Sequence, residues 1–87
     1  KNTERIDAPS GKAKYRIPDE LNHADEVIGE VKNVKHLDYT HQLRDFMHYA
    51  DEFGYTFRLF VDRRTQLSPE LQDLVDSGAI QLIRKRL

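Results

Sequence analysis

Residues 25–34 read DEVIGEVKNV, a run rich in Val and Ile that predicts a central strand of a β-sheet. Gly29, inside this run, allows another group to approach the backbone closely. Upstream, Tyr15–Asp19 (YRIPD) predicts a shorter strand that ends at Pro18, because proline cannot donate a hydrogen bond to a neighbouring strand. The polar residues 20–24 between the two runs predict a turn. The sequence therefore predicts two consecutive strands in its first half.

The segment after these strands predicts a helix. Over Asp38–Phe53 the apolar residues recur at i, i+3, i+4, i+7 and i+10 and form one stripe, which consists of Leu43, Phe46, Met47, Ala50 and Phe53. Gly54 stands where a left-handed C-terminal cap belongs. The next run, Tyr55–Val61 (YTFRLFV), has a period of two and predicts a strand with one buried face.

A second helix and a final strand complete the pattern. Ser68–Glu70 (SPE) supplies a hydroxyl cap, a proline in the first turn and an acid near the positive end of the helix dipole. This helix should stop at Gly78, and residues 79–84 predict a strand. The order β-β-α-β-α-β favours one α/β domain, with a mixed sheet of about four strands and two helices packed on it. We expect residues 15–87 to form the core and residues 1–14 to be a loose N-terminal arm.

Length and composition exclude several classes of protein. The 87 residues suffice for one domain, and the absence of Cys excludes a disulfide scaffold, thiol catalysis and Cys-based zinc sites. No apolar run approaches the ~18 residues of a membrane span, so we expect no membrane insertion. Fourteen Lys and Arg against fifteen Asp and Glu give a net charge of -1, so any nucleic-acid contact must be a local patch. The chain starts at Lys1 and not at Met, which we interpret as excision from a longer polypeptide.

Acidic residues on the first two predicted strands form a candidate metal site. Glu30 and Lys32 are two residues apart in a strand, so their side chains leave the same face. If the two strands are neighbours, Asp19 and Glu30 converge where the sheet opens. Two close carboxylates repel each other, and a divalent cation with a preference for oxygen ligands, Mg²⁺ or Mn²⁺, relieves this repulsion. The backbone carbonyl of Val31 is a third candidate ligand.

The same residues suggest a reaction. Lys32, a compact cation beside the metal, can orient a water or stabilise charge that develops on a phosphate. This pattern predicts metal-assisted hydrolysis of a phosphodiester bond. The alternative is a non-catalytic module that binds nucleic acid or protein, in which Glu30 and Lys32 form an ordinary solvated pair and Asp19 belongs to a turn.

Four runs of the sequence resemble a known group of enzymes: YRIPDELN (15–22), GEVKNVKHLDYTHQLRDFMHYA (29–50), TQLSPEL (65–71) and GAI (78–80). They are similar to the PD-(D/E)xK nuclease superfamily. More narrowly, they resemble the restriction-endonuclease-like toxin domains at the C-termini of bacterial polymorphic toxins, such as the Rhs and contact-dependent inhibition toxins. The resemblance implies a restriction-endonuclease-like core. It also implies a catalytic set made of Asp19, Glu30, Lys32 and Gln42, the last at the start of the following helix.

The resemblance also implies a biological role. It implies a Mg²⁺-dependent endonuclease, most directly a DNase, which a larger carrier polypeptide presents as its C-terminal toxic domain. Such a secreted effector would act in the cytoplasm of the target bacterial cell and would be held in check by a cognate immunity protein. RNA, and tRNA in particular, is the alternative substrate, because nothing in the sequence distinguishes the sugar.

Contacts to the nucleic acid should come from basic residues. The candidates are Lys14, Arg16, Arg63 and Arg64, within a wider set that adds Lys12, Arg84, Lys85 and Arg86. This set forms a phosphate track if the folded chain gathers it on one side. If not, these residues are solubilising surface charges.

Overall fold

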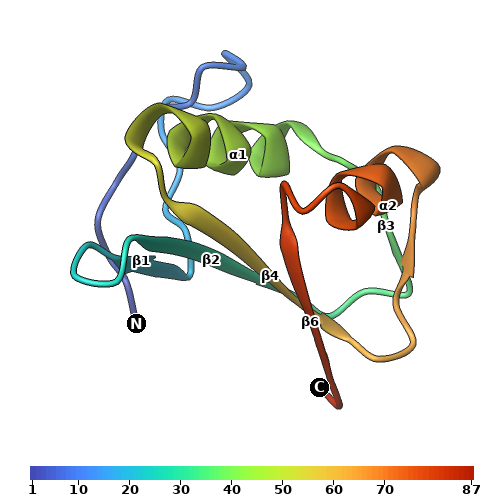
Figure 1. Cartoon of the computed structure of the whole chain (residues 1–87). Coiled ribbons are helices and arrows are strands. Elements are labelled where there is room, and N and C mark those ends of the chain that lie inside the picture. The colour runs from blue at the N-terminus through green and yellow to red at the C-terminus, as the bar shows by residue number, and fades with distance from the viewer.

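The predicted central strand lies inside a four-stranded sheet in the computed structural model, which describes residues 1–87. Strand β2 (Val27–Lys32) pairs with β1 (Glu20–Asn22) in antiparallel fashion and with β4 (Thr56–Asp62) in parallel. Strand β6 (Gln81–Lys85) pairs in parallel with β4, so the order across the sheet is β1-β2-β4-β6 (Figure 1). The structure confirms the mixed four-stranded sheet and the α/β class that the sequence predicts.

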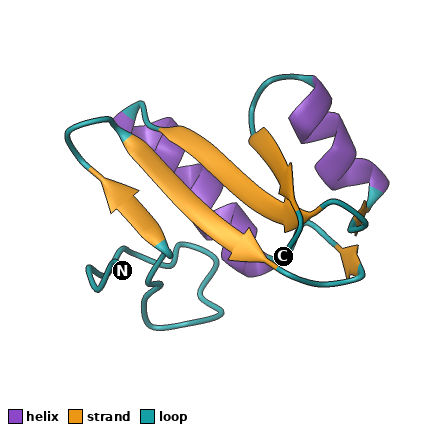
Figure 2. Cartoon of the chain, turned by 90° about the horizontal axis from the view of Figure 1, so that it is seen from below, coloured by secondary structure: helices purple, strands orange, loops and turns teal.

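Both predicted helices are present, with Gly54 and Ser68 as the predicted caps. Helix α1 (His41–Phe53) begins after Thr40, whose hydroxyl accepts a hydrogen bond from an amide of the first turn, and ends at Gly54, where φ is 71°. Helix α2 (Pro69–Asp76) begins after Ser68, which caps it in the same way. Helix α1 lies across one face of the sheet (Figure 1), and no helix covers the opposite face, which is seen directly in Figure 2. We call this uncovered side the open face of the sheet.

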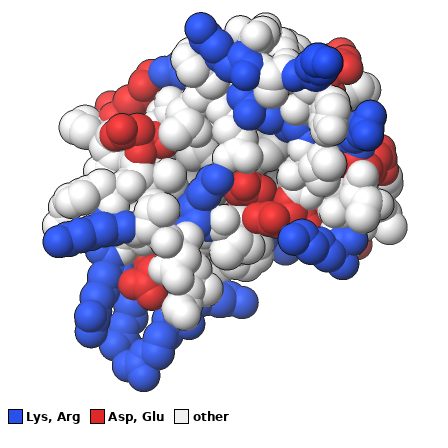
Figure 3. All heavy atoms as spheres, turned by 180° about the vertical axis from the view of Figure 1, so that it is seen from behind, with Lys and Arg blue, Asp and Glu red and all other residues white.

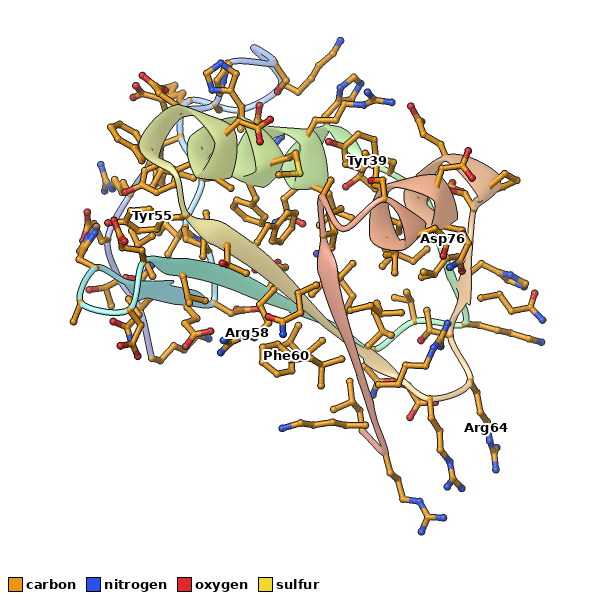
Figure 4. The ribbon with its side chains drawn as sticks, in the orientation of Figure 1. Tyr39, Tyr55, Arg58, Phe60, Arg64 and Asp76 are labelled. Atoms are coloured by element: carbon orange, nitrogen blue, oxygen red, sulfur yellow. The ribbon has the colours of Figure 1, made fainter.

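Alternation along β4 separates the core from the open face. Phe57, Leu59 and Val61 are buried on the side of α1, whereas Arg58 and Phe60 point the other way (Figure 4). The buried apolar side chains form one cluster: Ile6, Ile28, Leu37, Leu43, Phe46, Met47, Ala50, Phe57, Leu59, Val61, Leu71 and Ile80. The cluster holds the sheet to the helices on one side only.

The first strand lies later in the chain than predicted. Strand β1 occupies residues 20–22, which we expected to form a turn, and the predicted strand Tyr15–Asp19 contributes only an isolated bridge at Arg16. Pairing with β2 starts after Pro18, since proline cannot donate to the ladder. The turn instead uses residues 23–26, where Glu26 has a φ of 55°.

Two short strands were not predicted. Strand β3 (His36–Leu37) pairs in parallel with β5 (Gln66–Leu67) and forms a separate two-stranded sheet. A strand of two residues has no measurable periodicity, so the sequence gives no signal for it. This small sheet joins the segment after β2 to the segment before α2.

The N-terminal segment is not the loose arm that its polar composition suggested. Ile6 is only 6% exposed and belongs to the core cluster. Its backbone exchanges two hydrogen bonds of 2.9 Å with Arg16. The prediction was wrong for residues 1–14 because one apolar side chain and a pair of backbone hydrogen bonds are enough to fix the segment against α1.

A buried carboxylate on α1 also holds this segment. Asp45 is 2% exposed, and it accepts hydrogen bonds from the amide and the hydroxyl of Ser10 at 2.9 and 2.8 Å and from Arg16 Nε at 2.9 Å. Burial alone raises the pKa of Asp45, but the bonds from Arg16 and Ser10 together lower it below its ordinary value. Asp45 is therefore ionised at neutral pH and fixes the N-terminal segment to the helix.

We expect Asp45→Ala to lower the free energy of unfolding by about 2–4 kcal/mol at pH 7, because Arg16 and Ser10 lose their acceptor inside the protein. Urea denaturation measures the change. Asp51→Ala, at an exposed position of the same helix, should change the free energy by no more than about 0.5 kcal/mol. The difference between the variants should persist at pH 5 and shrink only below about pH 4. Equal effects of the two variants would show that Asp45 anchors nothing.

Candidate active site

The end of the β1–β2 hairpin brings Asp19 and Glu30 together. Glu20 pairs with Gly29 in the hairpin, so the residue before β1 lies opposite Glu30. The amide of Asp19 donates to Glu30 Oε1 at 3.1 Å, and Asp19 Oδ2 accepts from the amide of Val31 at 2.9 Å. Each carboxylate is therefore oriented by the backbone of the other strand. The β1–β2 ladder begins at Glu20, so Asp19 lies just outside it, beside Glu30.

Lys32 and Gln42 extend this arrangement toward α1. Lys32 Nζ lies 3.3 Å from Glu30 Oε2 and donates to Gln42 Oε1 at 2.5 Å. Glu30 and Lys32 point to the side of the helix because their partners in β4, Leu59 and Val61, are buried there. Gln42 reaches Lys32 from the first turn of α1. All four residues implied by the resemblance are in contact, in the order Asp19–Glu30–Lys32–Gln42.

Glu30 is the unusual group of the site. It is 5% exposed, and this burial is the largest cause of its raised pKa. The carboxyl of Asp19 raises the pKa further, whereas the hydrogen bond from the amide of Asp19 and the charge of Lys32 lower it. The resulting pKa of Glu30 is about 7. A carboxyl group with this pKa is close to half ionised at neutral pH. Perturbed pKa values of this size are typical of functional sites.

The donor set of the site fits a small hard cation. Asp19 and Glu30 supply carboxylate oxygens, and no group of three or more His, Cys, Asp and Glu side chains that could hold a metal is present. Mg²⁺ commonly takes one or two carboxylates from a protein and completes its shell with water and phosphate oxygens. A cation would also relieve the repulsion from Asp19, which adds to burial in raising the pKa of Glu30. Val31, the third predicted ligand, lies between Glu30 and Lys32 with its side chain exposed.

A hollow on the open face reaches the site from the other side. Its volume is about 580 Å³, and its lining includes Asp19, Asn22, Gly29 and Phe60. A Cβ atom at Gly29 would lie 2.6 Å from Glu20 Oε1, so the absence of a side chain there gives the close approach that the sequence suggested. Phe60 is not among the site residues predicted from the sequence. The available signal was a large aromatic residue among the polar positions of the Tyr55–Val61 run.

The structure divides the predicted nucleic-acid contacts into two regions. Arg63 and Arg64 are exposed in the turn after β4 and line one cavity. Arg16 is paired with Asp45, and Lys14 lies in the N-terminal segment, so neither joins that cavity. The four residues do not form one continuous track.

Comparison with known proteins gives one match. The family model described as "Restriction endonuclease fold toxin 7" matches residues 1–71. The matched region contains β1, β2, α1 and β4 and thus every residue of the contact chain, whereas β6 lies outside it. No curated protein and no solved structure matches the chain. Neither helix has the length and apolar composition that a membrane crossing requires.

Proposed function

The chain belongs to the restriction endonuclease fold toxin 7 family, and on this premise we propose that it is a metal-dependent endonuclease. One observation supports this proposal above the others. Asp19, Glu30, Lys32 and Gln42 come from three different elements and form one chain of contacts beside a strand end. A solvated surface pair would not bury its acid to 5% exposure or raise its pKa to about 7.

Asp19 and Glu30 would hold the Mg²⁺ or Mn²⁺ ion. The chemistry that such an ion supplies when bound is polarisation of the scissile phosphate and a lower pKa of a bound water. Glu30 is positioned for this by the amide of Asp19 and by Lys32. The Lys32 side chain is 26% exposed, so its ammonium group can reach a phosphate oxygen or a water while it keeps its contact with Glu30. Gln42 accepts from Lys32 and fixes the direction of the ammonium group.

We infer that the substrate is DNA and that the biological role is antibacterial. The toxin family and the resemblance to polymorphic toxins support this role. In this proposal the domain is the C-terminal part of a larger secreted carrier polypeptide and acts in the cytoplasm of the target bacterium. A cognate immunity protein would protect the producing cell. RNA is the alternative substrate for the same site.

A cleavage assay tests the proposal. The purified protein should degrade plasmid DNA in Mg²⁺ or Mn²⁺ and leave it intact in EDTA. Total RNA, incubated in parallel, should survive much longer, and calorimetric titration with Mn²⁺ should give heat. Degradation of RNA alone would replace DNA with RNA as the substrate. Failure to cleave either polymer in either metal, without heat on titration, would instead favour a non-catalytic binding module.

A further inference from the structure

A cavity lined only by charged residues lies at the corner where β4 and β6 end. Its volume is about 300 Å³, and it is lined by Asp62, Arg63, Arg64 and Arg86. The amide of Arg63 donates to the carbonyl of Lys85 at 2.8 Å, which joins the turn after β4 to the end of β6. Two segments that are about twenty residues apart in the sequence thus place their arginines together.

Arg84 shapes the turn that carries two of these arginines. Its Nη1 donates to the carbonyl oxygens of Asp62, Arg63 and Thr65 at 3.4, 3.3 and 2.7 Å. Three backbone carbonyls therefore converge on one guanidinium group. Arg84 has a structural role in this corner.

Asp62 leaves the arginines of the cavity unpaired. Its Oδ2 accepts from the amide of Arg64 at 2.9 Å, and its Oδ1 accepts from the amide of Leu87 at 3.0 Å. Both hydrogen bonds lower the pKa of Asp62, the one from Arg64 more than the one from Leu87. Both oxygens are thus bound to backbone amides, and no ion pair forms between Asp62 and an arginine.

The other arginines of the chain all have partners. Five of the eight contact an acid, an amide, an aromatic ring or backbone carbonyls: Arg5 with Tyr15, Arg16 with Asp45, Arg44 with Glu70 and Tyr39, Arg58 with Gln81 and Glu20, and Arg84 as above. The remaining three, Arg63, Arg64 and Arg86, are exposed and line the same cavity. Lys and Arg gather at this corner in Figure 3, at the lower left, and Arg64 projects from it in Figure 4.

This corner lies next to the candidate active site. Lys32 pairs with Val61, and Val61 pairs with Arg84, so the three lie in one row across the sheet. Two strand spacings separate Lys32 from Arg84 by about 10 Å. A second cavity of about 370 Å³ shares Asp62 and Arg64 with the first and extends to Asn33, the residue that follows Lys32. The two cavities form a path from the arginines to the end of β2.

We propose that Arg63, Arg64 and Arg86 form a phosphate-binding subsite that holds the backbone of the polynucleotide beside the bond near Lys32. This inference rests on the proposed nuclease function. Guanidinium groups bind phosphate oxygens in bidentate fashion, and these three have no competing partner. The cavity offers no aromatic ring on which a base could stack, and its guanidinium groups suit phosphate oxygens, so we expect binding with little dependence on base sequence. In a chain with a net charge of -1, this corner supplies the local positive patch.

Binding measured without cleavage tests the subsite. The probe is a labelled single-stranded 20-mer in EDTA, followed by fluorescence anisotropy over a series of salt concentrations. The variant Arg63→Gln/Arg64→Gln/Arg86→Gln should raise the Kd about tenfold or more and should reduce the slope of log K against log salt by about 2. A second 20-mer of shuffled sequence should bind within about twofold of the first.

The matched control removes the same charge elsewhere. Arg5→Gln/Arg44→Gln/Arg58→Gln also deletes three arginine charges, at positions that already have partners, and it should change the salt slope by less than about one. Equal losses of affinity in the two triple variants would mean that net charge alone matters and would overturn the subsite. An unchanged Kd in the variant of Arg63, Arg64 and Arg86, or a strong preference of the wild-type protein for one of the two probes, would overturn it as well. If that variant loses binding while the wild-type protein cleaves no nucleic acid, the subsite stands and the nuclease proposal fails.

Discussion

Lys32→Ala should lower the rate of plasmid cleavage by about 10²- to 10³-fold, because it removes a preorganised cation from the reacting phosphate. Lys32 Nζ is held between Glu30 Oε2 at 3.3 Å and Gln42 Oε1 at 2.5 Å, so its charge has a fixed position. A cation that is already oriented stabilises developing charge without reorganisation during the reaction. Single-turnover cleavage of supercoiled plasmid in Mg²⁺ measures the effect.

Two controls separate catalysis from folding and binding. Arg5→Ala also removes one positive charge, from an exposed position in the N-terminal segment, and should leave the rate within about threefold. The Kd of the Lys32→Ala protein for the 20-mer should rise only a few-fold, as expected for one lost phosphate contact. Wild-type cleavage by the Lys32→Ala protein would remove this lysine from the mechanism and leave the site with two carboxylates only.

Part of the arrangement of the candidate site could be predicted from the sequence because its geometry is local. A spacing of two places Glu30 and Lys32 on one face of any strand, and Pro18 limits strand pairing on its side of Asp19. The cap and the apolar stripe, both explicit in the sequence, place Gln42 in the first turn of α1, although its role at the site came only from the resemblance. These features depend on covalent geometry and local hydrogen bonding, which short windows of sequence contain.

The parts that could not be predicted depend on long-range packing. The partner of Arg16 is Asp45, which lies 29 positions away, and no periodicity marks a buried carboxylate on an otherwise typical helix. The sequence suggested nucleic-acid contact for Arg16 and Arg63 alike. Only the fold shows that Arg16 is neutralised by a buried acid while Arg63 is unpaired beside Arg86. Which face of the sheet stays open depends likewise on the side that α1 covers.

Glu30→Gln should abolish cleavage and, in the same protein, raise its stability at pH 8. The loss of cleavage, about 10²-fold or more, follows because an amide is a poor ligand for a hard cation compared with a carboxylate. The gain in stability follows because burial disfavours the charged form of Glu30 and raises its pKa to about 7. The variant keeps an acceptor for the amide of Asp19 and no longer buries a charge at pH 8.

The sign of the pH dependence follows from this pKa. Glu30 binds its proton more tightly in the folded protein than at the ordinary value of 4.5, so the stability of the wild-type protein should fall as the pH rises from about 4.5 to about 7. Glu30→Gln lacks this dependence. In EDTA the two proteins should have similar midpoints in urea at pH 5, and at pH 8 the variant should be more stable by about 1–2 kcal/mol, a value reduced for solvent that reaches the site.

The comparison with Asp45 makes this prediction specific. Both acids are buried on the same side of the sheet, but Asp45 accepts three hydrogen bonds, two of them from Ser10 and one from a guanidinium, whereas Glu30 has one amide donor and a lysine at 3.3 Å. Removal of a fully satisfied carboxylate destabilises a protein, and removal of an under-compensated one stabilises it. Mg²⁺ should raise the urea midpoint of the wild-type protein at pH 8 and leave that of Glu30→Gln unchanged. A loss of stability in Glu30→Gln, comparable to that of Asp45→Ala, would make Glu30 a structural acid and would leave the proposed metal without its buried ligand.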